Sequence, residues 1–330
     1  MRALVVGLGS IGRRHARNWV RAGLGDVEVC RQARLPLPEP LGVSAREFDT
    51  LDAALSESPD VVLVTNPTSL HVATTRRALE AGAHVFVEKP LGDSLEGVSE
   101  VLTQAANKVV MVGYNLRFHP GLQRLRHLLH AGAIGRPLSV RAESGEYLPG
   151  WHPWEDYRRS YSGRKDLGGG AVLTFSHELD AVYWLLGEPS TVTAVTAHAS
   201  ALEIDTEDVA EIVLTFPSGT IASIHMDYVR GPARRQVEIV GADGVLRWEY
   251  EPNRILRYAP ATREWLVEEG DPRFKRNDMF LAELCEFAAL ARGEGQTRLG
   301  ANARQGAAVL RIALAALRSA AEGHRVDLHD

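Results

Sequence analysis

The sequence is poor in cysteine and has no long apolar segment. Its 330 residues include two cysteines, Cys30 and Cys285, which excludes a disulfide framework and a Cys-x-x-Cys metal motif. No apolar run approaches the ~18 residues that a membrane span needs. Acidic residues outnumber basic ones, 42 to 37, which disfavours a general nucleic-acid or acidic-membrane binder. We expect a cytoplasmic protein with no membrane or nucleic-acid partner.

Lysine is also scarce, since 33 of the 37 basic residues are arginine. The four lysines are Lys89, Lys108, Lys165 and Lys275. Arginine keeps its proton near neutral pH, whereas lysine can lose it. Lys89 follows the apolar segment 84–87 and precedes Pro90, which favours an extended backbone at Lys89. Two interpretations stay open: a group that exchanges a proton, and an ordinary surface lysine.

The first third of the chain alternates short β-branched segments with helical ones. Strands are expected at 3–6, 27–30, 61–64, 84–87 and 109–112, with helices at 11–22 and 68–81. Such alternation is typical of βαβ units and a parallel sheet.

The pattern changes from residue 119. A helix is expected at 120–130, strands at 210–216, 222–228, 237–240 and 245–250, and helices at 277–292 and 301–321. Strands of period two joined by turns predict an antiparallel sheet with two unlike faces. We predict a doubly wound parallel α/β domain over 1–118. We predict an α+β domain over 119–330, with an open, mostly antiparallel sheet and helices on one face.

A Gly-x-Gly-x-x-Gly motif lies between the first expected strand and helix. Gly7 permits a tight turn, Gly9 lets the backbone approach a pyrophosphate, and Gly12 lets helix and strand pack closely. The helix start, with Ser10 and Ile11, offers amide donors to an anion. A dinucleotide site is predicted; a glycine turn of any α/β protein is the alternative.

The end of the second strand lacks the acid that holds the ribose hydroxyl of NAD about 20 residues after the glycines. Arg31 and Arg34 stand there instead. Arg31 could hold a 2′-phosphate, which favours NADP over NAD. Ordinary surface charge is the alternative.

A polar pair lies on a helix that is apolar on nearly all sides. His177 and Asp180 are one turn apart, and burial without polar partners would be costly. They either satisfy each other structurally or line a polar site. In a site, an imidazole oriented by a carboxylate is a general acid or base near neutral pH.

Together these motifs resemble the glucose–fructose oxidoreductase, inositol dehydrogenase and MocA (Gfo/Idh/MocA) family of NAD(P)-dependent oxidoreductases. The resemblance covers nearly the whole chain. The matching pieces are Gly7–Gly12, Thr65-Asn66-Pro67 with His71, Glu88-Lys89-Pro90, Gly113–Phe118, Gly168–Gly170 and His177-x-x-Asp180.

The resemblance implies a Rossmann domain, an open sheet through which dimers or tetramers form, and a set of site residues. It implies that Lys89, His177 and Asp180 line the substrate as catalytic residues. Besides the glycine loop, Arg31 and Lys89, the residues expected near the cofactor are Thr65, Asn66, Pro67, His71, Glu88 and Asn115. Leu173 stands where many members carry Asp, which leaves the substrate class open.

The segment 147–165 is similar to a branch associated with sialic-acid-like and other acylamino sugars. Aromatic rings suit the C–H face of a sugar, and cations suit a carboxylate or phosphate; ordinary loop packing is the alternative. The candidate substrate contacts are Tyr114, Arg117, Trp151, Trp154, Tyr161, Arg164 and Lys165. The spacing of His, Asp and Glu predicts no metal site.

We therefore predict an enzyme that reversibly oxidises a secondary hydroxyl of a sugar, sugar derivative or cyclitol with NADP or NAD. The hydroxyl proton would pass to His177 or Lys89, and Asp180 would orient His177. The alternatives are a non-catalytic nucleotide sensor, and a hydrolase or lyase with no net redox change.

Overall fold

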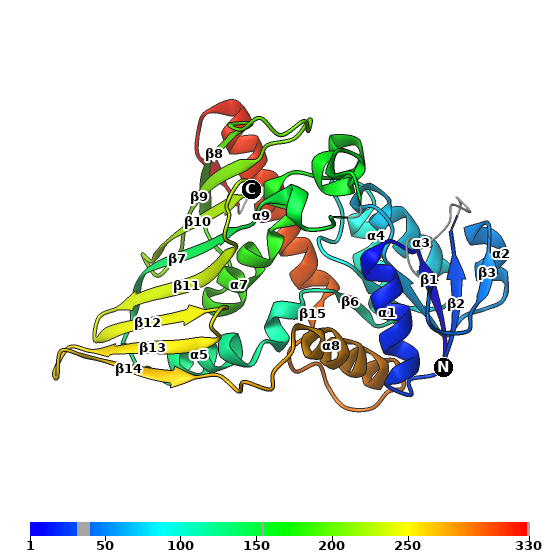
Figure 1. Ribbon diagram of the computed structural model, residues 1–330, viewed down its shortest axis with the longest axis horizontal. Coiled ribbons are helices and arrows are strands. Elements are labelled where there is room, and N and C mark those ends of the chain that lie inside the picture. Colours follow the sequence, from blue (N-terminus) through cyan, green and yellow to red (C-terminus); the bar gives the residue numbers. More distant parts are fainter. Residues whose placement is uncertain (32–39, 154, 329–330) are drawn as a thin grey trace. The chain divides into compact units, whose positions relative to one another are not determined.

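The computed structural model describes residues 1–31, 40–153 and 155–328 (Figure 1). The chain forms two compact units. Unit 1 consists of Met1–Phe118 and Lys275–Leu310, and unit 2 of His119–Phe274 and Arg311–Asp330. The chain passes from unit 1 to unit 2 after Phe118, returns to unit 1 at Lys275 and re-enters unit 2 at Arg311.

Unit 1 is built on a seven-stranded sheet with the order β15-β6-β5-β4-β1-β2-β3. Its ladders are parallel except for the pairing of β15 with β6. The strands are β1 (Arg2–Val6), β2 (Asp26–Cys30), β3 (Arg46–Phe48), β4 (Val61–Val64), β5 (His84–Val87), β6 (Val110–Val112) and β15 (Ala301–Asn302). All four side chains of β4 are buried, as expected for a strand covered on both faces. The predicted Rossmann fold is confirmed.

Helices cover this sheet, and the later chain segment supplies one of them. Trp19, Phe86 and Phe287 belong to one buried core cluster, and the ring centroids of Phe86 and Phe287 are 5.7 Å apart. Residues 275–310 join unit 1 because the apolar side of α8 completes this core. The helices are α1 (Ser10–Arg21), α2 (Leu51–Ser56), α3 (His71–Glu80), α4 (Val98–Gln104) and α8 (Arg276–Ala291), with 3₁₀ turns η1 (Thr68–Leu70) and η2 (Asn115–Phe118).

Unit 2 is built on a nine-stranded sheet with the order β14-β13-β12-β11-β7-β10-β9-β8-β16. The β7–β10 pair is parallel and the other ladders are antiparallel. The strands are β7 (Pro137–Gly145), β8 (Thr191–Ala197), β9 (Val209–Thr215), β10 (Ile221–Asp227), β11 (Arg234–Gly241), β12 (Gly244–Glu249), β13 (Arg254–Ala259), β14 (Glu264–Glu269) and β16 (Val326–Asp327). This sheet is the predicted open, mostly antiparallel one.

One face of this sheet is covered by helices and the other is open. Inward side chains such as Ile212, Ile224 and Trp248 are fully buried, and they alternate with exposed or half-buried ones. The helices are α5 (Pro120–His130), α6 (Ala171–Thr174) and α7 (Ser176–Leu186), with 3₁₀ turns η3 (Leu148–Gly150), η4 (Tyr157–Arg159), η5 (Tyr161–Gly163) and η6 (Lys165–Leu167). Helix α9 (Ala303–Glu322) begins in unit 1 and ends in unit 2. None of the described helices is both long and apolar enough to cross a membrane.

Candidate active site

The glycine loop between β1 and α1 has no room for a side chain at its first and last glycines, but it has open space at the middle one. Gly7 has a φ of +96°, and a Cβ there would lie 2.8 Å from the Asn66 Cα. A Cβ at Gly12 would lie 2.0 Å from the Gly7 carbonyl oxygen. At Gly9 nothing lies within 4 Å of the Cβ position, and no side chain caps the start of α1, where Ser10 and Ile11 form the first turn. This open helix start fits the pyrophosphate of a dinucleotide.

The loop after β4 is fastened to the glycine loop. The Thr65 hydroxyl lies 2.7 Å from the Gly7 carbonyl oxygen and 3.0 Å from that of Val6, either of which can accept its proton. The Asn66 side-chain amide donates to Thr74 Oγ1 at 2.9 Å, and Pro67 precedes η1. These contacts hold Asn66 at the carboxyl end of β4.

His71 joins this loop to the one after β5. It is buried, with Nδ1 2.8 Å from the Pro90 carbonyl oxygen and Nε2 2.9 Å from that of Asn66. Burial lowers its pKa, so the ring is neutral near pH 7 and donates to one of the two carbonyls at a time. His71 thereby holds residues 65–67 beside residues 88–90.

Lys89 lies at the carboxyl end of β5 and is half-buried. The strands β5, β4 and β1 are neighbours in the sheet, and adjacent strands are about 4.8 Å apart. The Lys89 loop, the Asn66 loop and the glycine loop therefore share one edge of the sheet. Open α/β sheets bind ligands at this edge.

Glu88 is buried beside Lys89 and is held by a histidine that the sequence analysis did not single out. His15 Nε2 lies 2.7 Å from Glu88 Oε1, and the Lys89 amide donates to Glu88 Oε2 at 3.2 Å. Burial opposes ionisation of Glu88, but the hydrogen bond and charge of His15, with the charge of Lys89, outweigh it and lower the pKa of Glu88. Glu88 is therefore an anion next to Lys89.

The segment after β6 is buried throughout. Tyr114, Asn115 and Arg117 all have less than a tenth of their surface exposed. Arg117 donates to the Gln305 side-chain oxygen at 2.9 Å and to the Leu299 carbonyl at 3.5 Å. These bonds attach η2 to the first turn of α9 and to the segment before it, which gives Arg117 a packing role in unit 1.

Arg31, at the end of β2, has an acidic partner. Its Nε donates to Glu47 Oε1 at 2.5 Å. Glu47 lies on β3 opposite Val29 of β2, so it reaches this position through strand pairing rather than through sequence proximity. Arg34 lies outside the described residues.

In unit 2, His177 and Asp180 lie one turn apart on α7. His177 is half-buried, and Asp180 is 1% exposed. The preceding glycines allow a close fit: a Cβ at Gly170, where φ is +103°, would meet the Glu207 carboxylate. Glu207 Oε1 accepts the Val172 amide at 3.0 Å, and burial raises the pKa of Glu207. Glu207 thus fixes the start of α6, in which Leu173 is buried.

The other candidate substrate residues of unit 2 are aromatic side chains, which are at least partly buried, and cationic side chains, which are exposed. Trp151 packs edge-on against Phe175 and Tyr228, each at 5.5 Å between ring centroids, and Tyr161 is half-buried. Arg164 pairs with Asp166 at 2.5 Å, and Lys165 is exposed. Trp154 lies outside the described residues.

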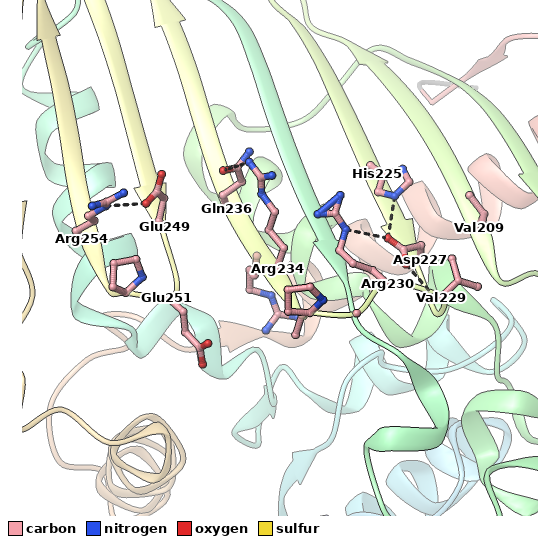
Figure 2. Close-up of a pocket in the computed structure, with 15 residues that line it drawn as sticks. Val209, His225, Asp227, Val229, Arg230, Arg234, Gln236, Glu249, Glu251 and Arg254 are labelled. Atoms are coloured by element: carbon pink, nitrogen blue, oxygen red, sulfur yellow. Dashed lines mark hydrogen bonds and ion pairs between the residues drawn. The ribbon is translucent and has the colours of Figure 1, made fainter.

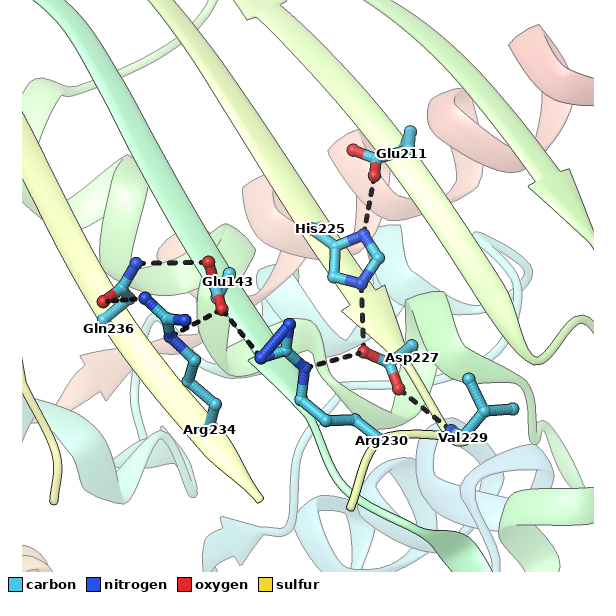
Figure 3. Close-up of polar contacts among 8 residues, drawn as sticks. All are labelled: Glu143, Glu211, His225, Asp227, Val229, Arg230, Arg234 and Gln236. Carbon is cyan, nitrogen blue, oxygen red and sulfur yellow. Dashed lines mark hydrogen bonds and ion pairs between the residues drawn. The ribbon is translucent and has the colours of Figure 1, made fainter. Parts of the chain in front are cut away.

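A second polar surface lies on the open face of the sheet of unit 2. A cavity of about 830 Å³ there is lined by residues of β9 to β13 and the turns that join them (Figure 2). Four of the lining residues, His225, Asp227, Arg230 and Arg234, belong to a chain of alternating charges that crosses β9, β10, β7 and β11 (Figure 3). Its contacts are Glu211–His225 at 2.6 Å, His225–Asp227 at 2.9 Å, Asp227–Arg230 at 3.7 Å, Arg230–Glu143 at 3.3 Å and Glu143–Arg234 at 2.8 Å.

His225 stands between two carboxylates in this chain. The hydrogen bond to Asp227, supported by that to Glu211, raises the pKa of His225 to about 9. The same contact helps to lower the pKa of Asp227 against the effect of its burial. Within this chain of six residues, three positive side chains therefore balance three negative ones near pH 7, and their charges sum to zero.

Family comparisons match both units. Residues 1–116 match the description "Oxidoreductase family, NAD-binding Rossmann fold", and residues 122–247 match "GFO/IDH/MocA C-terminal domain". The chain belongs to the Gfo/Idh/MocA family. The predictions of family, of fold and of an oxidoreductase acting on CH–OH groups are thereby confirmed, and so is binding of NAD(P), with the choice between NAD and NADP open.

Individual relatives of this Gfo/Idh/MocA member act on different molecules. The chain is 32% identical over 260 residues to myo-inositol 2-dehydrogenase of Thermotoga maritima, covering 74% of each chain. It is 32% identical over 242 residues to 2,7-anhydro-N-acetylneuraminate hydratase of Escherichia coli K12, covering 70% of this chain and 64% of that relative. The structure of levoglucosan dehydrogenase with NADH and levoglucosan aligns with a TM-score of 0.85 and 20% identity over the whole of both chains, which shows a shared fold.

Proposed function

We propose that this enzyme reversibly oxidises a secondary hydroxyl of an acylamino sugar, another sugar derivative or a cyclitol with NAD(P). The observation that carries the proposal is the placement of Lys89 on the sheet edge that also holds the open glycine loop. In this proposal the glycine loop, Asn66, Glu88 and Asn115 hold the cofactor.

The chain's own residues handle the hydroxyl proton. When bound, the nicotinamide accepts the hydride from the substrate carbon. Lys89 donates a hydrogen bond to the substrate oxygen as an ammonium, or takes its proton as a neutral amine. His177 is the alternative proton acceptor. The carboxylate of Asp180 orients His177 and stabilises its imidazolium.

The sequence of unit 2 favours an acidic acylamino sugar within this class. The E. coli relative is named for an anhydro-N-acetylneuraminate, and segment 147–165 independently resembles a branch associated with such sugars. Lys165 is exposed, and its ammonium group suits a substrate carboxylate, whereas Arg164 is already paired with Asp166. Leu173 stands in α6 where many family members carry Asp. The carboxylate of such an Asp would repel an anionic substrate, and this chain lacks it.

A reaction without net redox change is the second candidate. The name of the same E. coli relative, a hydratase, favours it. In such a reaction the same residues would exchange protons, but the coenzyme would end in the oxidation state in which it began. Product analysis by mass spectrometry, with the absorbance of the reduced coenzyme at 340 nm followed in parallel, separates the two candidates.

The substitution Lys89→Arg tests the proposal directly. Arginine keeps the charge and cannot act as a base, so kcat should fall by about 10² to 10⁴-fold with coenzyme binding retained. Lys108→Arg is the matched control, since the Lys108 amine bonds a backbone carbonyl that arginine can also reach. Turnover of Lys89→Arg at the rate of the control would remove Lys89 from the proton chemistry.

The choice of coenzyme depends in this proposal on Arg31. We propose that its guanidinium donates hydrogen bonds to the 2′-phosphate of NADP, in competition with the carboxylate of Glu47. Glu47→Gln removes the competing anion and should increase the preference for NADP over NAD. Arg31→Ala should decrease it. An unchanged ratio of the two dissociation constants in both variants would contradict this role.

We also propose that a second copy of the chain covers the open face of the sheet of unit 2. Val195 is 69% exposed and Ile221 51% exposed on this face, and the adjoining charges are balanced in sum. Exposed apolar side chains beside a neutralised polar network suit burial against a like surface. Ile221→Asp should lower the mass measured by light scattering toward that of one chain, whereas an unchanged mass would place any interface elsewhere.

A further inference from the structure

The buried hydroxyl of Tyr228 connects segment 147–165 of unit 2 to the helices that follow it. Tyr228 comes directly after β10 and is fully buried. Its hydroxyl donates to the Ser162 carbonyl oxygen at 3.1 Å, and the same oxygen accepts the Gly170 amide at 2.9 Å. Ser162 lies in the segment, and Gly170 directly precedes α6. One carbonyl of the segment is therefore bonded both to Tyr228 and to the start of α6.

The ring of Tyr228 makes a second connection between the same two parts of unit 2. Its centroid is 5.5 Å from that of Trp151, in the segment, and 5.5 Å from that of Phe175. The rings of Trp151 and Phe175 are also 5.5 Å apart, so the three rings form a closed cluster. Aromatic pairs at this separation attract each other beyond their apolar burial. Phe175 lies between α6 and α7, two residues before His177.

The backbone of Tyr228 adds two further bonds to this arrangement. Its carbonyl oxygen accepts the Leu148 amide at 2.9 Å, and its amide donates to the Asp208 carbonyl oxygen at 2.8 Å. Glu207, the neighbour of Asp208, accepts the first two amides of α6, one on its carbonyl oxygen and one on its carboxylate. Tyr228 thus contacts the segment at three points and is joined to α6 through residues 207 and 208.

The glycine run before α6 gives the segment room to reach this position. A Cβ at Gly169 would lie 2.3 Å from the Tyr161 carbonyl oxygen and 2.6 Å from that of Ser162. Both contacts are with backbone atoms, so a side chain at Gly169 would push residues 161 and 162 away from α6. The Ser162 carbonyl would then also move relative to the Tyr228 hydroxyl.

The hydroxyl is the part of Tyr228 that a packing role alone does not need. A phenylalanine ring would fill the same place, whereas a buried hydroxyl is costly unless it is hydrogen-bonded. The Ser162 carbonyl already has the Gly170 amide as a donor. The hydroxyl therefore strengthens the link between the segment and the helices, because the backbone of the segment is satisfied without it.

We propose that Tyr228 is a positioning residue that holds segment 147–165 against α6 and α7, and thereby sets the affinity of the enzyme for its sugar. This role rests on the proposed function, in which the segment contacts the substrate and α7 carries His177 and Asp180. Tyr228 is fully buried, so it acts through the segment. A segment that is already held in place loses less conformational entropy when the substrate binds.

The first test measures the link itself and needs no activity. Tyr228→Phe keeps the ring and removes one hydrogen bond, so amide hydrogen exchange of the whole protein should be about fivefold faster in peptides that cover residues 147–175. Peptides from unit 1 should be unchanged. Tyr258→Phe is the matched control, since Tyr258 is a half-buried tyrosine of the same unit, on β13, whose ring contacts Trp265.

The second test separates positioning from chemistry. The probes are N-acetylneuraminate, an acidic acylamino sugar, and myo-inositol, a cyclitol. In Tyr228→Phe the KM for the sugar should rise about fivefold, while kcat and the dissociation constant of NAD(P) stay at the values of Tyr258→Phe. Gly169→Ala displaces the segment from the other side and should raise KM in the same direction.

Two outcomes would refute the assignment. If exchange in Tyr228→Phe is the same as in the wild type, or rises equally in every peptide of unit 2, Tyr228 is only a packing residue. If kcat falls while KM is unchanged, the segment does not set the affinity for the sugar. Faster exchange confined to residues 147–175, in a protein that oxidises no sugar, would support the link and refute the proposed function instead.

Discussion

The protein contains two clusters of one histidine and two carboxylates, and they hold their protons on different groups. In unit 2, His225 on the open sheet face bonds both Glu211 and Asp227, and its pKa rises to about 9. In unit 1, His15 bonds Glu88, and it is the carboxyl of Glu283 whose pKa is raised.

Access to water explains the difference. The side chain of His225 is 31% exposed and that of Glu211 60%, so water solvates the imidazolium and one of its carboxylates. Asp227 is only 4% exposed, but hydrogen bonds from His225 and the Val229 amide keep it ionised. The side chain of His15 is fully buried and that of Glu88 is 11% exposed, so two neighbouring carboxylates cannot both be ionised without a large cost. The same residue types thus form a charge network at a surface and a neutral acid in a core.

The largest expected effect comes from removing each histidine. His15→Leu leaves Glu88 buried without its main donor and should lower the free energy of unfolding by about 3 kcal/mol. His225→Leu leaves Asp227 with the Val229 amide and Arg230 as partners and should therefore cost less than His15→Leu. Urea denaturation at pH 7 measures both losses. Equal losses would show that burial does not distinguish the two clusters.

The second effect concerns the pH dependence of stability in unit 1. Because the pKa of Glu283 is higher in the folded than in the unfolded chain, its favourable contribution is complete below about pH 4.3 and falls as the pH rises. Glu283→Gln has no proton to lose, so it should be more stable than the wild type at pH 8, by about 1 kcal/mol or more. Denaturation curves from pH 5 to 9 that stay parallel for the two proteins would contradict a raised pKa.

The third effect is the pH dependence of stability that His225 contributes, which falls in a different pH range from that of Glu283. The pKa of His225 is about 9 in the folded protein and about 6.5 in an unfolded chain. Its stabilising contribution is therefore complete below pH 6.5 and is lost as the pH rises through 9. In His225→Gln the slope between pH 7 and 10 should be shallower. The light-scattering mass over the same range shows whether the proposed interface responds to this proton.

The smallest effect separates the two partners of His225. Asp227 contributes most to its raised pKa, and Glu211 is the more exposed partner. Asp227→Asn should therefore move the titration of His225, followed by NMR, further toward 6.5 than Glu211→Gln does. Glu211→Gln should change the stability by no more than about 0.5 kcal/mol. A larger shift from Glu211→Gln would reverse the order of the two partners.

Local patterns predicted the elements of unit 1 that position its candidate residues. The strands at 61–64 and 84–87 were predicted to the residue, and α1 within one residue at each end. These segments combine a clear apolar period with glycine or proline at their ends. Gly9 was correctly placed at an open helix start because the spacing of the three glycines has a direct geometric meaning.

Features that depend on tertiary pairing were not predicted. Strand β14 was missed because all six of its side chains are exposed, so it has no alternation to detect. Residues 301–302 were assigned to the last helix, but they pair with β6 as β15. Glu47 meets Arg31 because β3 pairs with β2. Glu283 lies near Glu88 although it belongs to a helix almost 200 residues later in the chain. Neither pair has a signature in sequence spacing.

The return of residues 275–310 to unit 1 has a consequence for synthesis of the chain. The core of the first unit includes Leu284, Phe287 and Ala288 together with Trp19 and Phe86. While the ribosome is still translating residues 119–274, the nascent nucleotide-binding half has its apolar surface uncovered. Chaperone binding should therefore persist until α8 has emerged, and a fragment that stops at residue 118 should aggregate unless it is fused to residues 275–310.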